Sequence, residues 1–392
     1  MSELRDFLSI KHGWAFKGEY FSDTGEQSIL TPGNFYEAGG FKRNSEKDRF
    51  YIGEFPSEFV CKKDDLIVAM TEQAAGLLGS TALVPEDDRY LHNQRIGLID
   101  CNDKMYKYFA YYLFMTKTVR EQISRSASGT KVKHTSPEKI YDVKVTVPKI
   151  QEQEKIANLL MNLDHKIALN NQINEELESM AKTLYDYWFV QFDFPDENGK
   201  PYKSSGGKMV YNDQLKREIP EGWGVKRLGE LAIATGKRDA NFGTENGQYD
   251  FWTTANEPIK ADEYSFEGKA ILIAGNGNFY INFTEGKFEA YQRTYVIQSA
   301  DENELLFMYP ACLQSIEKLR KGSNGSIIKY ITIGDVQNIS QPHCPVIANM
   351  FVDIFRPIMN TIQKNKQQNQ ELTQLRDWLL PMLMNGQVKV EE

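Results

Sequence analysis

Cysteine and histidine are scarce in this chain of 392 residues, and their spacing excludes most thiol and metal chemistry. No Cys-x-x-Cys pair occurs, which argues against a zinc ribbon or a disulfide framework and favours a reducing compartment. The five histidines form no pair at the spacing of helical metal ligands. No run approaches the roughly 18 uninterrupted apolar residues of a membrane span, and no secretory signal is visible. We therefore expect a cytoplasmic protein that contacts no membrane and binds no metal.

The motifs of the common nucleotide enzymes are also missing. No Gly-x-x-x-x-Gly-Lys-Ser/Thr run is present, and AGNGNFY at 274–280 lacks the third glycine of a dinucleotide fingerprint. No two prolines are adjacent, so the Asn/Asp-Pro-Pro-aromatic run of an adenine methyltransferase is absent. PDENGK at 195–200 is better interpreted as a solvated turn than as a nuclease triplet. We expect no catalytic residue and no cofactor bound by this chain.

Charge is distributed unevenly along the sequence. The formal net charge of −8 argues mildly against a freestanding nucleic-acid binder, because phosphate neutralisation needs Lys and Arg. Residues 117–133 nevertheless carry five bases against one acid, whereas residues 37–88 carry eleven acids against six bases. Any nucleic-acid contact is therefore expected to be local.

The two halves of the sequence resemble each other. DDLIVAM (64–70) corresponds to GKAILIAG (268–275), and HNQRIGLI (92–99) corresponds to AYQRTYVI (290–297). A helical segment follows in each half, at 106–123 and at 303–320, and then a basic glycine turn, SGTKVKH or NGSIIKY. Gly129 and Gly325 lie 196 residues apart, as do Lys133 and Lys329. Such internal repetition predicts a duplicated structural unit.

A long helix is predicted at the end of each half, with apolar residues at the alternating spacings of three and four that are typical of a coiled coil. Adding 195 to the first set of positions gives the second set, and the two agree in kind at nine of ten positions. Two ordinary core helices remain the alternative. The two sets are Ile156, Leu160, Leu163, Ile167, Asn170, Asn174, Leu177, Ala181, Leu184, Trp188 and Phe351, Phe355, Ile358, Ile362, Asn365, Asn369, Leu372, Arg376, Leu379, Leu383.

If the two helices pair in antiparallel fashion, Asn170 should approach Asn369 and Asn174 should approach Asn365, within about 10 Å. Buried asparagines cost stability but fix register and orientation. About 40 residues at 1.5 Å each give a rod of roughly 60 Å. Such a rod would hold two modules at a set distance, and DNA, whose grooves repeat every ~34 Å, is a natural ligand for that arrangement.

Several stretches resemble the specificity (S) subunit of type I restriction-modification enzymes. They are IPEGWGVKRLGELA, the run DLIVAM, LGSTALVP and HNQRIGLI, the helix QEQEKIANLLMNLDHKIALNNQINEELESMAKTLYDYWFVQFDFP, and the tail LRDWLLPMLMNGQV. The resemblance extends over essentially the whole chain, and the order of the stretches matches. It implies an α+β chain with two tandem target-recognition domains, internal pseudo-two-fold symmetry and two long antiparallel coiled-coil helices.

The resemblance also implies a function. Each recognition domain would read one half of a bipartite, asymmetric site in double-stranded DNA, and the helices would set the length of the unread spacer. The chain would have no activity of its own but would gather two methyltransferase (M) subunits, which use S-adenosylmethionine. Two restriction (R) subunits, which use ATP and Mg, could join them. The runner-up hypothesis is a two-headed coiled-coil scaffold that bridges two proteins without touching DNA.

The domain boundaries follow from the repeat and the resemblance. We expect recognition domain 1 at 1–148, spacer helix 1 at 149–190, a linker at 191–216, recognition domain 2 at 217–345, and spacer helix 2 with the C-terminal tail at 346–386. The aromatic run LYDYWFVQFDF (184–194) is expected to be buried rather than to stack on bases. Two departures from the family pattern stand out. Pro357 should delay or bend the second helix, and Arg376 interrupts its apolar seam.

The repeat also sorts candidate DNA contacts, because shared residues should hold the fold or the phosphates and divergent residues should read bases. Lys133 and Lys329 are the shared phosphate candidates. Arg95 and Arg293 are shared too, and either a structural network or a DNA contact would explain them. Five cations lie towards helix ends, where the helix dipole is a sufficient explanation for some of them: Arg120, Arg125, Lys318, Arg320 and Lys321. The divergent candidates are Glu72 and Gln73, which we align with Asn276 and Asn278 of the second half, and Lys131 and His134, which we align with Ile327 and Tyr330.

Overall fold

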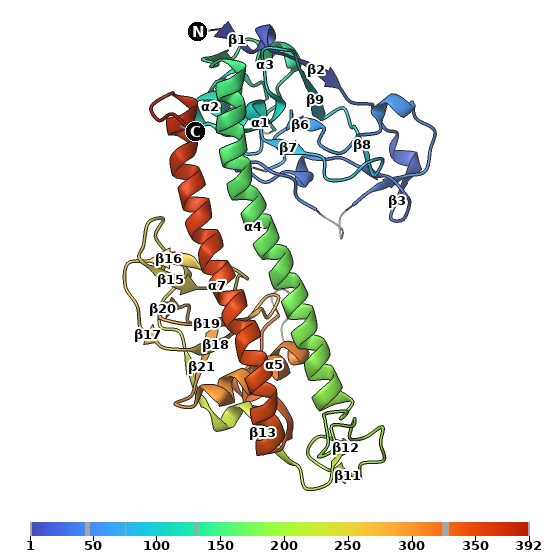
Figure 1. Cartoon of the computed structure of the whole chain (residues 1–392), viewed down its shortest axis with the longest axis vertical. Coiled ribbons are helices and arrows are strands. Elements are labelled where there is room, and N and C mark those ends of the chain that lie inside the picture. The colour runs from blue at the N-terminus through green and yellow to red at the C-terminus, as the bar shows by residue number, and fades with distance from the viewer. Residues whose placement is uncertain (1, 44–47, 75, 130–131, 324–328, 391–392) are drawn as a thin grey trace. The chain divides into compact units, whose positions relative to one another are not determined.

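The chain folds into two compact units, each built from a mixed set of short helices and strands. The computed structural model describes residues 2–43, 48–74, 76–129, 132–323 and 329–390. Unit 1 comprises residues 1–169 and 367–392, and unit 2 comprises residues 170–366. Two long helices, α4 (Ile150–Tyr185) and α7 (Pro345–Met384), each contribute one part to both units (Figure 1).

Unit 1 is organised around the four-stranded antiparallel sheet β2-β9-β6-β7. A smaller sheet has the order β3-β5-β4-β8, and β1 pairs with β10. The elements are β1 (Ser2–Glu3), β2 (Leu8–His12), β3 (Phe21–Ser22), β4 (Ser28–Ile29), β5 (Phe50–Tyr51), β6 (Leu66–Ala69), β7 (Thr81–Leu83), β8 (Tyr90–Leu91), β9 (Ile96–Cys101), α1 (Lys107–Met115), α2 (Lys117–Ser126), α3 (Pro137–Tyr141) and β10 (Lys144–Val145).

Unit 2 repeats this plan with the sheet β14-β21-β18-β19. Its second sheet has the order β16-β15-β20-β17, and two further pairs are β13-β22 and β11-β12. The elements are β11 (Met209–Asn212), β12 (Arg217–Pro220), β13 (Gly224–Arg227), β14 (Ala232–Thr235), β15 (Tyr249–Trp252), β16 (Ile259–Ala261), β17 (Phe266–Glu267), β18 (Ala270–Ala274), β19 (Ile281–Thr284), β20 (Lys287–Ala290), β21 (Thr294–Gln298), α5 (Glu302–Gly322), α6 (Ile333–Gln337) and β22 (Ser340–His343).

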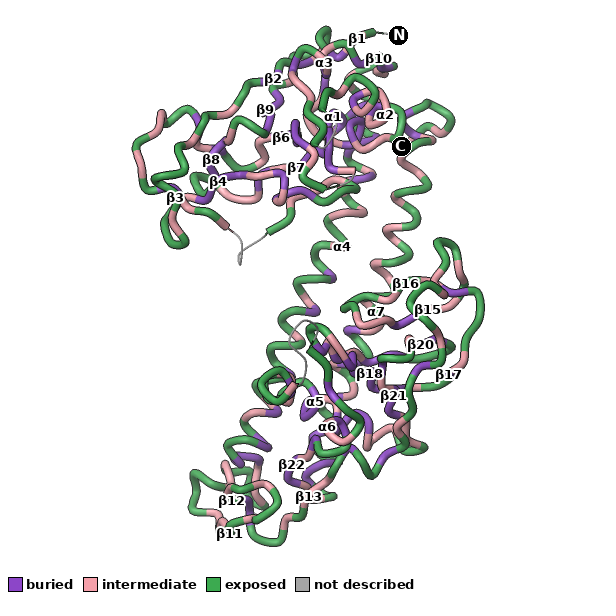
Figure 2. Tube along the Cα trace, turned by 180° about the vertical axis from the view of Figure 1, so that it is seen from behind, coloured by how far each residue is buried: buried purple, intermediate pink, exposed green. Residues whose placement is uncertain are grey.

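Each unit buries its apolar side chains between its four-stranded sheet and its helices. In unit 1 the core joins Leu66 and Val68 of β6 to Phe109 and Phe114 of α1. In unit 2 the strand β18 is buried along its whole length, as the continuous apolar run in AILIA predicts (Figure 2). The expected helical segment at 106–123 is divided at Thr116, whose hydroxyl caps α2 by accepting from the backbone N–H of Val119.

Within each unit the parts of α4 and α7 run antiparallel. In unit 2, Asn365 Nδ2 donates to Asn174 Oδ1 at 2.9 Å, the approach expected for that pair. Further along, the ring of Tyr185 lies 6.1 Å from that of Phe351. None of the twenty seam positions is exposed. The expected pair of Asn170 and Asn369 has one member in each unit and stays a prediction.

Arg376, the departure from the apolar seam, is accounted for in unit 1. Its guanidinium lies 2.8 Å from Oδ1 of Asp164 on α4, and Tyr112 of α1 donates to the other carboxylate oxygen at 2.6 Å. Burial and the charge of Asp164 raise the pKa of Tyr112, so its hydroxyl stays protonated as a donor. This network therefore fixes the registers of both helices against the recognition domain.

The expected delay of the second helix at Pro357 is wrong, because α7 begins at Pro345 and continues through Pro357. Pro357 and Asp353, the residue whose carbonyl loses its helical partner, are both exposed. Water can therefore satisfy that carbonyl, which lowers the cost of the missing N–H.

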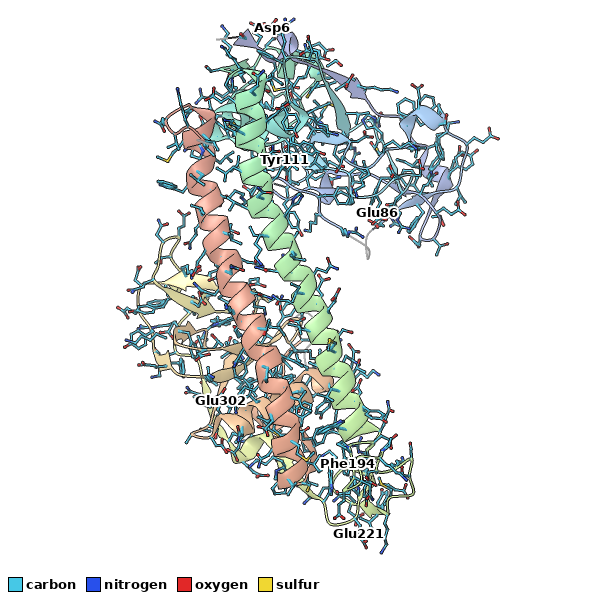
Figure 3. The ribbon with its side chains drawn as sticks, viewed as in Figure 1. Asp6, Glu86, Tyr111, Phe194, Glu221 and Glu302 are labelled. Carbon is cyan, nitrogen blue, oxygen red and sulfur yellow. The ribbon has the colours of Figure 1, made fainter. Side chains whose placement is uncertain are left out.

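Most of the aromatic run at the end of α4 is buried, as expected, although Tyr187 is 38% exposed. A π-helical turn, Asp186–Val190, follows Tyr185, and Trp188, Phe189 and Phe194 are each at most 5% exposed. Phe194 stacks on Trp223 at 4.8 Å between ring centroids (Figure 3). The expected linker is therefore an ordered part of unit 2, and its strand β11 pairs with β12 at the start of the second recognition domain.

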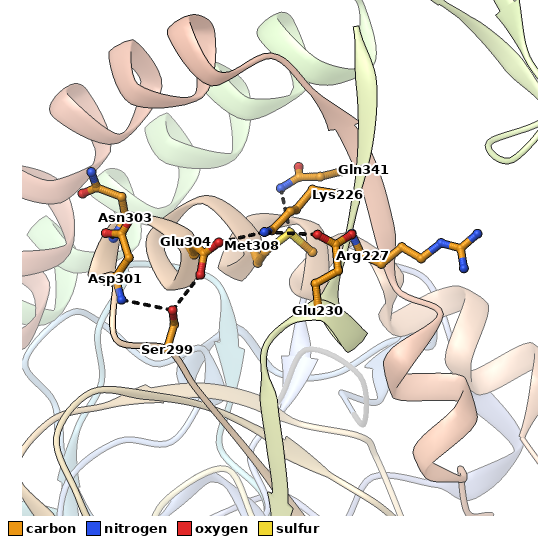
Figure 4. A network of polar contacts seen from close by, with 9 residues as sticks. All are labelled: Lys226, Arg227, Glu230, Ser299, Asp301, Asn303, Glu304, Met308 and Gln341. Atoms are coloured by element: carbon orange, nitrogen blue, oxygen red, sulfur yellow. Dashed lines mark hydrogen bonds and ion pairs between the residues drawn. The ribbon is translucent and has the colours of Figure 1, made fainter.

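A polar network fastens the start of the second recognition domain to α5 (Figure 4). Lys226 Nζ lies 2.7 Å from Glu304 and 3.2 Å from Glu230, and Ser299 donates to Glu304 at 2.7 Å. Both units begin alike, because the N–H of Leu4 bonds to Val143 O and that of Leu228 bonds to Ile339 O.

The buried His92 holds the turn that leads into β9. It is 1% exposed, and its Nε2 lies 2.8 Å from the carbonyl of Ile96. Burial lowers its pKa from an ordinary value of 6.5 to about 4, so the ring is neutral near pH 7.

We predict that His92 makes the chain sensitive to acid. Because the folded pKa lies below the unfolded value, unfolding takes up a proton between pH 6.5 and 4, and stability is lost as the pH falls through that window. The loss should be on the order of 2–3 kcal/mol. Urea unfolding at pH 7.5 and pH 4.5 should show a smaller pH dependence for His92→Gln than for the parent chain. Equal pH dependence in both would contradict the prediction.

Candidate nucleic-acid interface

Three loops meet at one end of the main sheet in unit 1, and we call their described residues loop triad 1: residues 70–74 and 76, residues 92–95, and residues 128–129 and 132–135. Backbone hydrogen bonds hold them together. Met70 N donates to Arg95 O at 3.0 Å, Glu72 N to Lys133 O at 2.9 Å, and Thr135 N to Met70 O at 2.9 Å. The loops therefore form one surface although they lie up to about sixty residues apart in sequence.

Loop triad 2, residues 275–278, 290–293 and 329–331, has the same construction in unit 2. Gly275 N donates to Arg293 O at 2.7 Å, Gly277 N to Lys329 O at 3.0 Å, and Ile331 N to Gly275 O at 3.0 Å. Each bond has its counterpart in loop triad 1, at offsets of 205, 198 and 196 residues for the three loops. The two triads are thus equivalent in backbone.

The equivalence corrects one sequence alignment. Glu72 corresponds to Gly277, not to Asn276, because both donate to the carbonyl of the shared lysine. Gln73 then corresponds to Asn278, and the partner of Asn276 is Thr71. His134 is equivalent to Tyr330, as expected. His134 forms an isolated bridge with Thr71, and Tyr330 forms the same bridge with Asn276.

Most candidate contact residues lie on the two triads, and most are exposed. Glu72 and Asn276 are half-buried. Lys131 lies outside the described residues. The exposed candidates on the triads are Gln73, Arg95, Lys133, His134, Asn278, Arg293, Lys329 and Tyr330.

The remaining two candidates lie on helices. Arg125 is in the last turn of α2 and bonds to Glu121 at 3.0 Å, beside a hollow of about 510 Å³ that Lys117 and Lys144 also line. Lys321 is exposed near the end of α5. Neither is tied to a triad by a backbone bond.

Several candidates already have partners in the chain. The carboxylate of Glu72 accepts from the N–H of Gly76 at 3.1 Å, which closes its own loop. Lys133 Nζ lies 3.3 Å from Ser124 Oγ, and Asn278 Nδ2 donates to Tyr280 at 3.1 Å. By contrast, in the described part of the chain the guanidinium groups of Arg95 and Arg293 have no hydrogen bond or ion pair. These two arginines are therefore available to a ligand.

Supporting residues that sequence reasoning missed hold the triads from behind. Arg120 of α2 donates to the carbonyls of Gly76 and Glu37, and Arg320 of α5 donates to that of Asn278 at 3.4 Å. Because the helix dipole can explain a cation at the positions of Arg120 and Arg320, the sequence did not indicate that they contact the loops. In unit 2 the fully buried Glu289 lies 3.4 Å from Arg238, whose carbonyl accepts from Gln292 N.

Beside each triad a large side chain packs against a glycine, and the large residue and the glycine occupy opposite positions in the two units. In unit 1 the sulfur of Met70 lies over Gly97, 3.3 Å from where a Cβ would be. In unit 2 the equivalent positions are Gly275 and Tyr295, and the tyrosine hydroxyl donates to Ile331 O at 3.1 Å. Tyr295 and Gly275 line a hollow of about 350 Å³ together with Thr235, Gln292, Arg293 and Ile331.

This surface is suited to binding rather than to catalysis. It presents lysine, arginine and amide side chains on loops, the groups that contact phosphates and base edges. Among the described residues no group of three or more His, Cys, Asp and Glu side chains is placed to hold a metal ion. No helix in that part of the chain is long and apolar enough to cross a bilayer.

Comparison with known proteins agrees with a duplicated specificity chain. A relative from Methanocaldococcus jannaschii, the type I restriction enzyme MjaIX specificity subunit, is 29% identical over 328 residues, which cover 76% of this chain and 73% of the relative. The EcoDI specificity subunit of Escherichia coli is 35% identical over 180 residues, 44% of this chain and 40% of that one.

A solved structure shares the fold. The crystal structure of a type I restriction-modification system S subunit from M. genitalium matches with a TM-score of 0.60 at 16% identity, covering 97% of this chain and 95% of that one. The family profile described as type I restriction modification DNA specificity domain matches residues 1–179 and again residues 220–374. The chain therefore belongs to the type I restriction-modification specificity subunits and carries two tandem recognition domains.

Proposed function

We propose that each recognition domain reads one half of a bipartite, asymmetric DNA site through its loop triad. The observation that carries this proposal is the match of the two triads in backbone and their difference in side chains. Equivalent backbones place side chains equivalently, while Glu72, Gln73 and His134 differ from Gly277, Asn278 and Tyr330. Two unlike readers on like frames fit an asymmetric site.

The long helices set the spacer between the two half-sites in this proposal. Their register is fixed within unit 1 by Arg376 and Asp164 and within unit 2 by Asn365 and Asn174. A change in helix length would move one reader relative to the other by about 1.5 Å for each residue.

The helices also offer equivalent docking positions for two M subunits. Met180 on α4 and Leu375 on α7 are 195 residues apart in the repeat, and they are 61% and 43% exposed. Apolar side chains exposed at equivalent points of both copies fit two identical partners. In this proposal the M subunits bring S-adenosylmethionine, any R subunits bring ATP and Mg, and this chain brings no catalytic group.

The scaffold hypothesis remains the second candidate because the net charge is −8. We expect weak, salt-sensitive DNA binding by the chain alone and much tighter binding when M subunits add their own phosphate contacts. A scaffold that bridges two proteins would show no DNA binding in either state.

The decisive experiment maps methylated adenines in a host with and without this chain. We expect methylation at a split site, with two short specified halves and a fixed gap, only when the chain is present. Methylation that is unchanged on deletion, or that occurs at a continuous site, would contradict the proposal.

Removal of a free arginine from a triad should weaken DNA binding without changing the sequence read. For Arg95→Ala and for Arg293→Ala, in complexes with M subunits, we expect the slope of log affinity against log salt to fall by about 1. Lys200→Ala, on an exposed turn of unit 2, is the control and should keep the parent slope. An unchanged slope in both arginine variants would show that they do not touch phosphate.

Acidic side chains at the docking positions should each remove one M subunit. Met180→Glu and Leu375→Glu should lower the mass of the assembly, measured by light scattering or native mass spectrometry, by one M subunit apiece. Gln151→Glu adds the same charge to an exposed site in the first turn of α4 and should assemble fully. Full assembly of all three variants would place the docking surface elsewhere.

A further inference from the structure

One polar contact in loop triad 1 joins a buried residue to an exposed one. Thr71, at the end of the strand, is 6% exposed, whereas His134 on the glycine-turn loop is exposed. Their backbones form an isolated bridge, and Thr71 Oγ1 lies 3.1 Å from His134 Nδ1. Because this contact occupies Nδ1, only Nε2 of the imidazole remains for another partner.

Loop triad 2 has a different pair of side chains at the same two positions. Asn276 and Tyr330 form the equivalent bridge, Asn276 is half-buried, and Tyr330 is 43% exposed. In both triads, therefore, a partly or fully covered residue at the strand end is bridged through its backbone to an exposed residue with a hydrogen-bonding ring.

The residues around this pair are the same in kind in both units. Lys133 and Lys329 directly precede the exposed ring, and Arg95 and Arg293 accept the neighbouring backbone bond through their carbonyls. The lysine and the arginine are thus the same in both triads, where they could contact phosphates. The exposed ring residue and the residue bridged to it differ between the triads. A change confined to such a pair alters hydrogen-bonding chemistry without moving the frame.

We propose that this cross-loop pair is a base-specificity element of each recognition domain. It rests on the proposed function. His134 contacts a base edge in the first half-site, and Thr71 is the positioning residue that aims its ring. Tyr330 takes the same place in the second half-site, supported by Asn276.

The chemistry of the pair indicates which base edges it reads. In this proposal the Thr71 hydroxyl donates to Nδ1, so the ring proton of His134 resides on Nε2 and the imidazole presents a donor. Donors pair with the N7 and O6 atoms of guanine, N7 of adenine or O4 of thymine in the major groove. The hydroxyl of Tyr330 both donates and accepts, so the second domain is not limited to acceptor edges.

The test compares Thr71→Val with Thr71→Ser in complexes with M subunits. Valine has nearly the shape of threonine but no hydroxyl, whereas serine keeps the hydroxyl. The measurement is relative methylation of duplexes in which each base pair of both half-sites is varied in turn. We expect Thr71→Val to relax discrimination about 5–100-fold at one base pair of the first half-site, in keeping with the discrimination of a good base contact. Thr71→Ser should restore it.

His134→Ala is a second test, and it should not disturb the fold because the side chain is exposed. We expect it to relax discrimination at the same base pair. Tyr330→Phe should affect one base pair of the second half-site only. Unchanged discrimination in Thr71→Val and His134→Ala, or a uniform loss on every sequence, would overturn the proposal. If the parent complex does not methylate a split site, the proposed function itself is wrong. That result is obtained with the unmodified chain, so it is distinguishable from the results of the variants.

Discussion

The surface that each loop triad forms depends on a short set of backbone hydrogen bonds between the end of β6 or β18 and the segment before α3 or α6. In unit 1 Glu72 N and Thr135 N make these bonds, and in unit 2 Gly277 N and Ile331 N make them. Main-chain bonds do not depend on side-chain identity. The loops can therefore keep one shape while their side chains diverge between the two units.

A second constraint acts on the helices, through polar contacts where apolar ones would be more stabilising. Asn174 and Asn365 bond to each other, and Arg376 bonds to Asp164. A purely apolar seam tolerates sliding by one heptad, whereas each polar pair is satisfied in only one register. The cost in stability is therefore offset by a single defined register of the two helices within each unit.

Much of this architecture was predictable from the sequence, because repetition is visible without coordinates. The heptad positions from Ile156 to Trp188 and their copies 195 residues later gave both helices, and the shared Gln-Arg pairs gave the start of equivalent strands. The burial of the aromatic run near Phe194 followed from its place after an amphipathic helix. Periodicity is a local property, and it survives where side chains face a core.

The sequence was less informative where long-range contacts decide the outcome. Thr71 is the residue equivalent to Asn276, and the two sequences alone do not show this. Equivalent residues are 205 positions apart in the first loop of each triad but 196 apart in the third, although these loops contact each other. Arg120 and Arg320 lie towards helix ends, where the helix dipole alone can explain a cation, yet they support the triads. Nor could Pro357 be judged without knowing that it faces water. In each case the deciding neighbour is distant along the chain.

The exchange of volumes beside the triads limits how these domains can be recombined. Met70 fills the space above Gly97, and Tyr295 fills the space above Gly275. A hybrid that joined β6 of unit 1 to β21 of unit 2 would place Met70 against Tyr295. The reverse hybrid, with β18 and β9, would place Gly275 against Gly97. The first would be overpacked and the second hollow. Viable crossovers should therefore fall outside the sheets, so that whole recognition domains are exchanged.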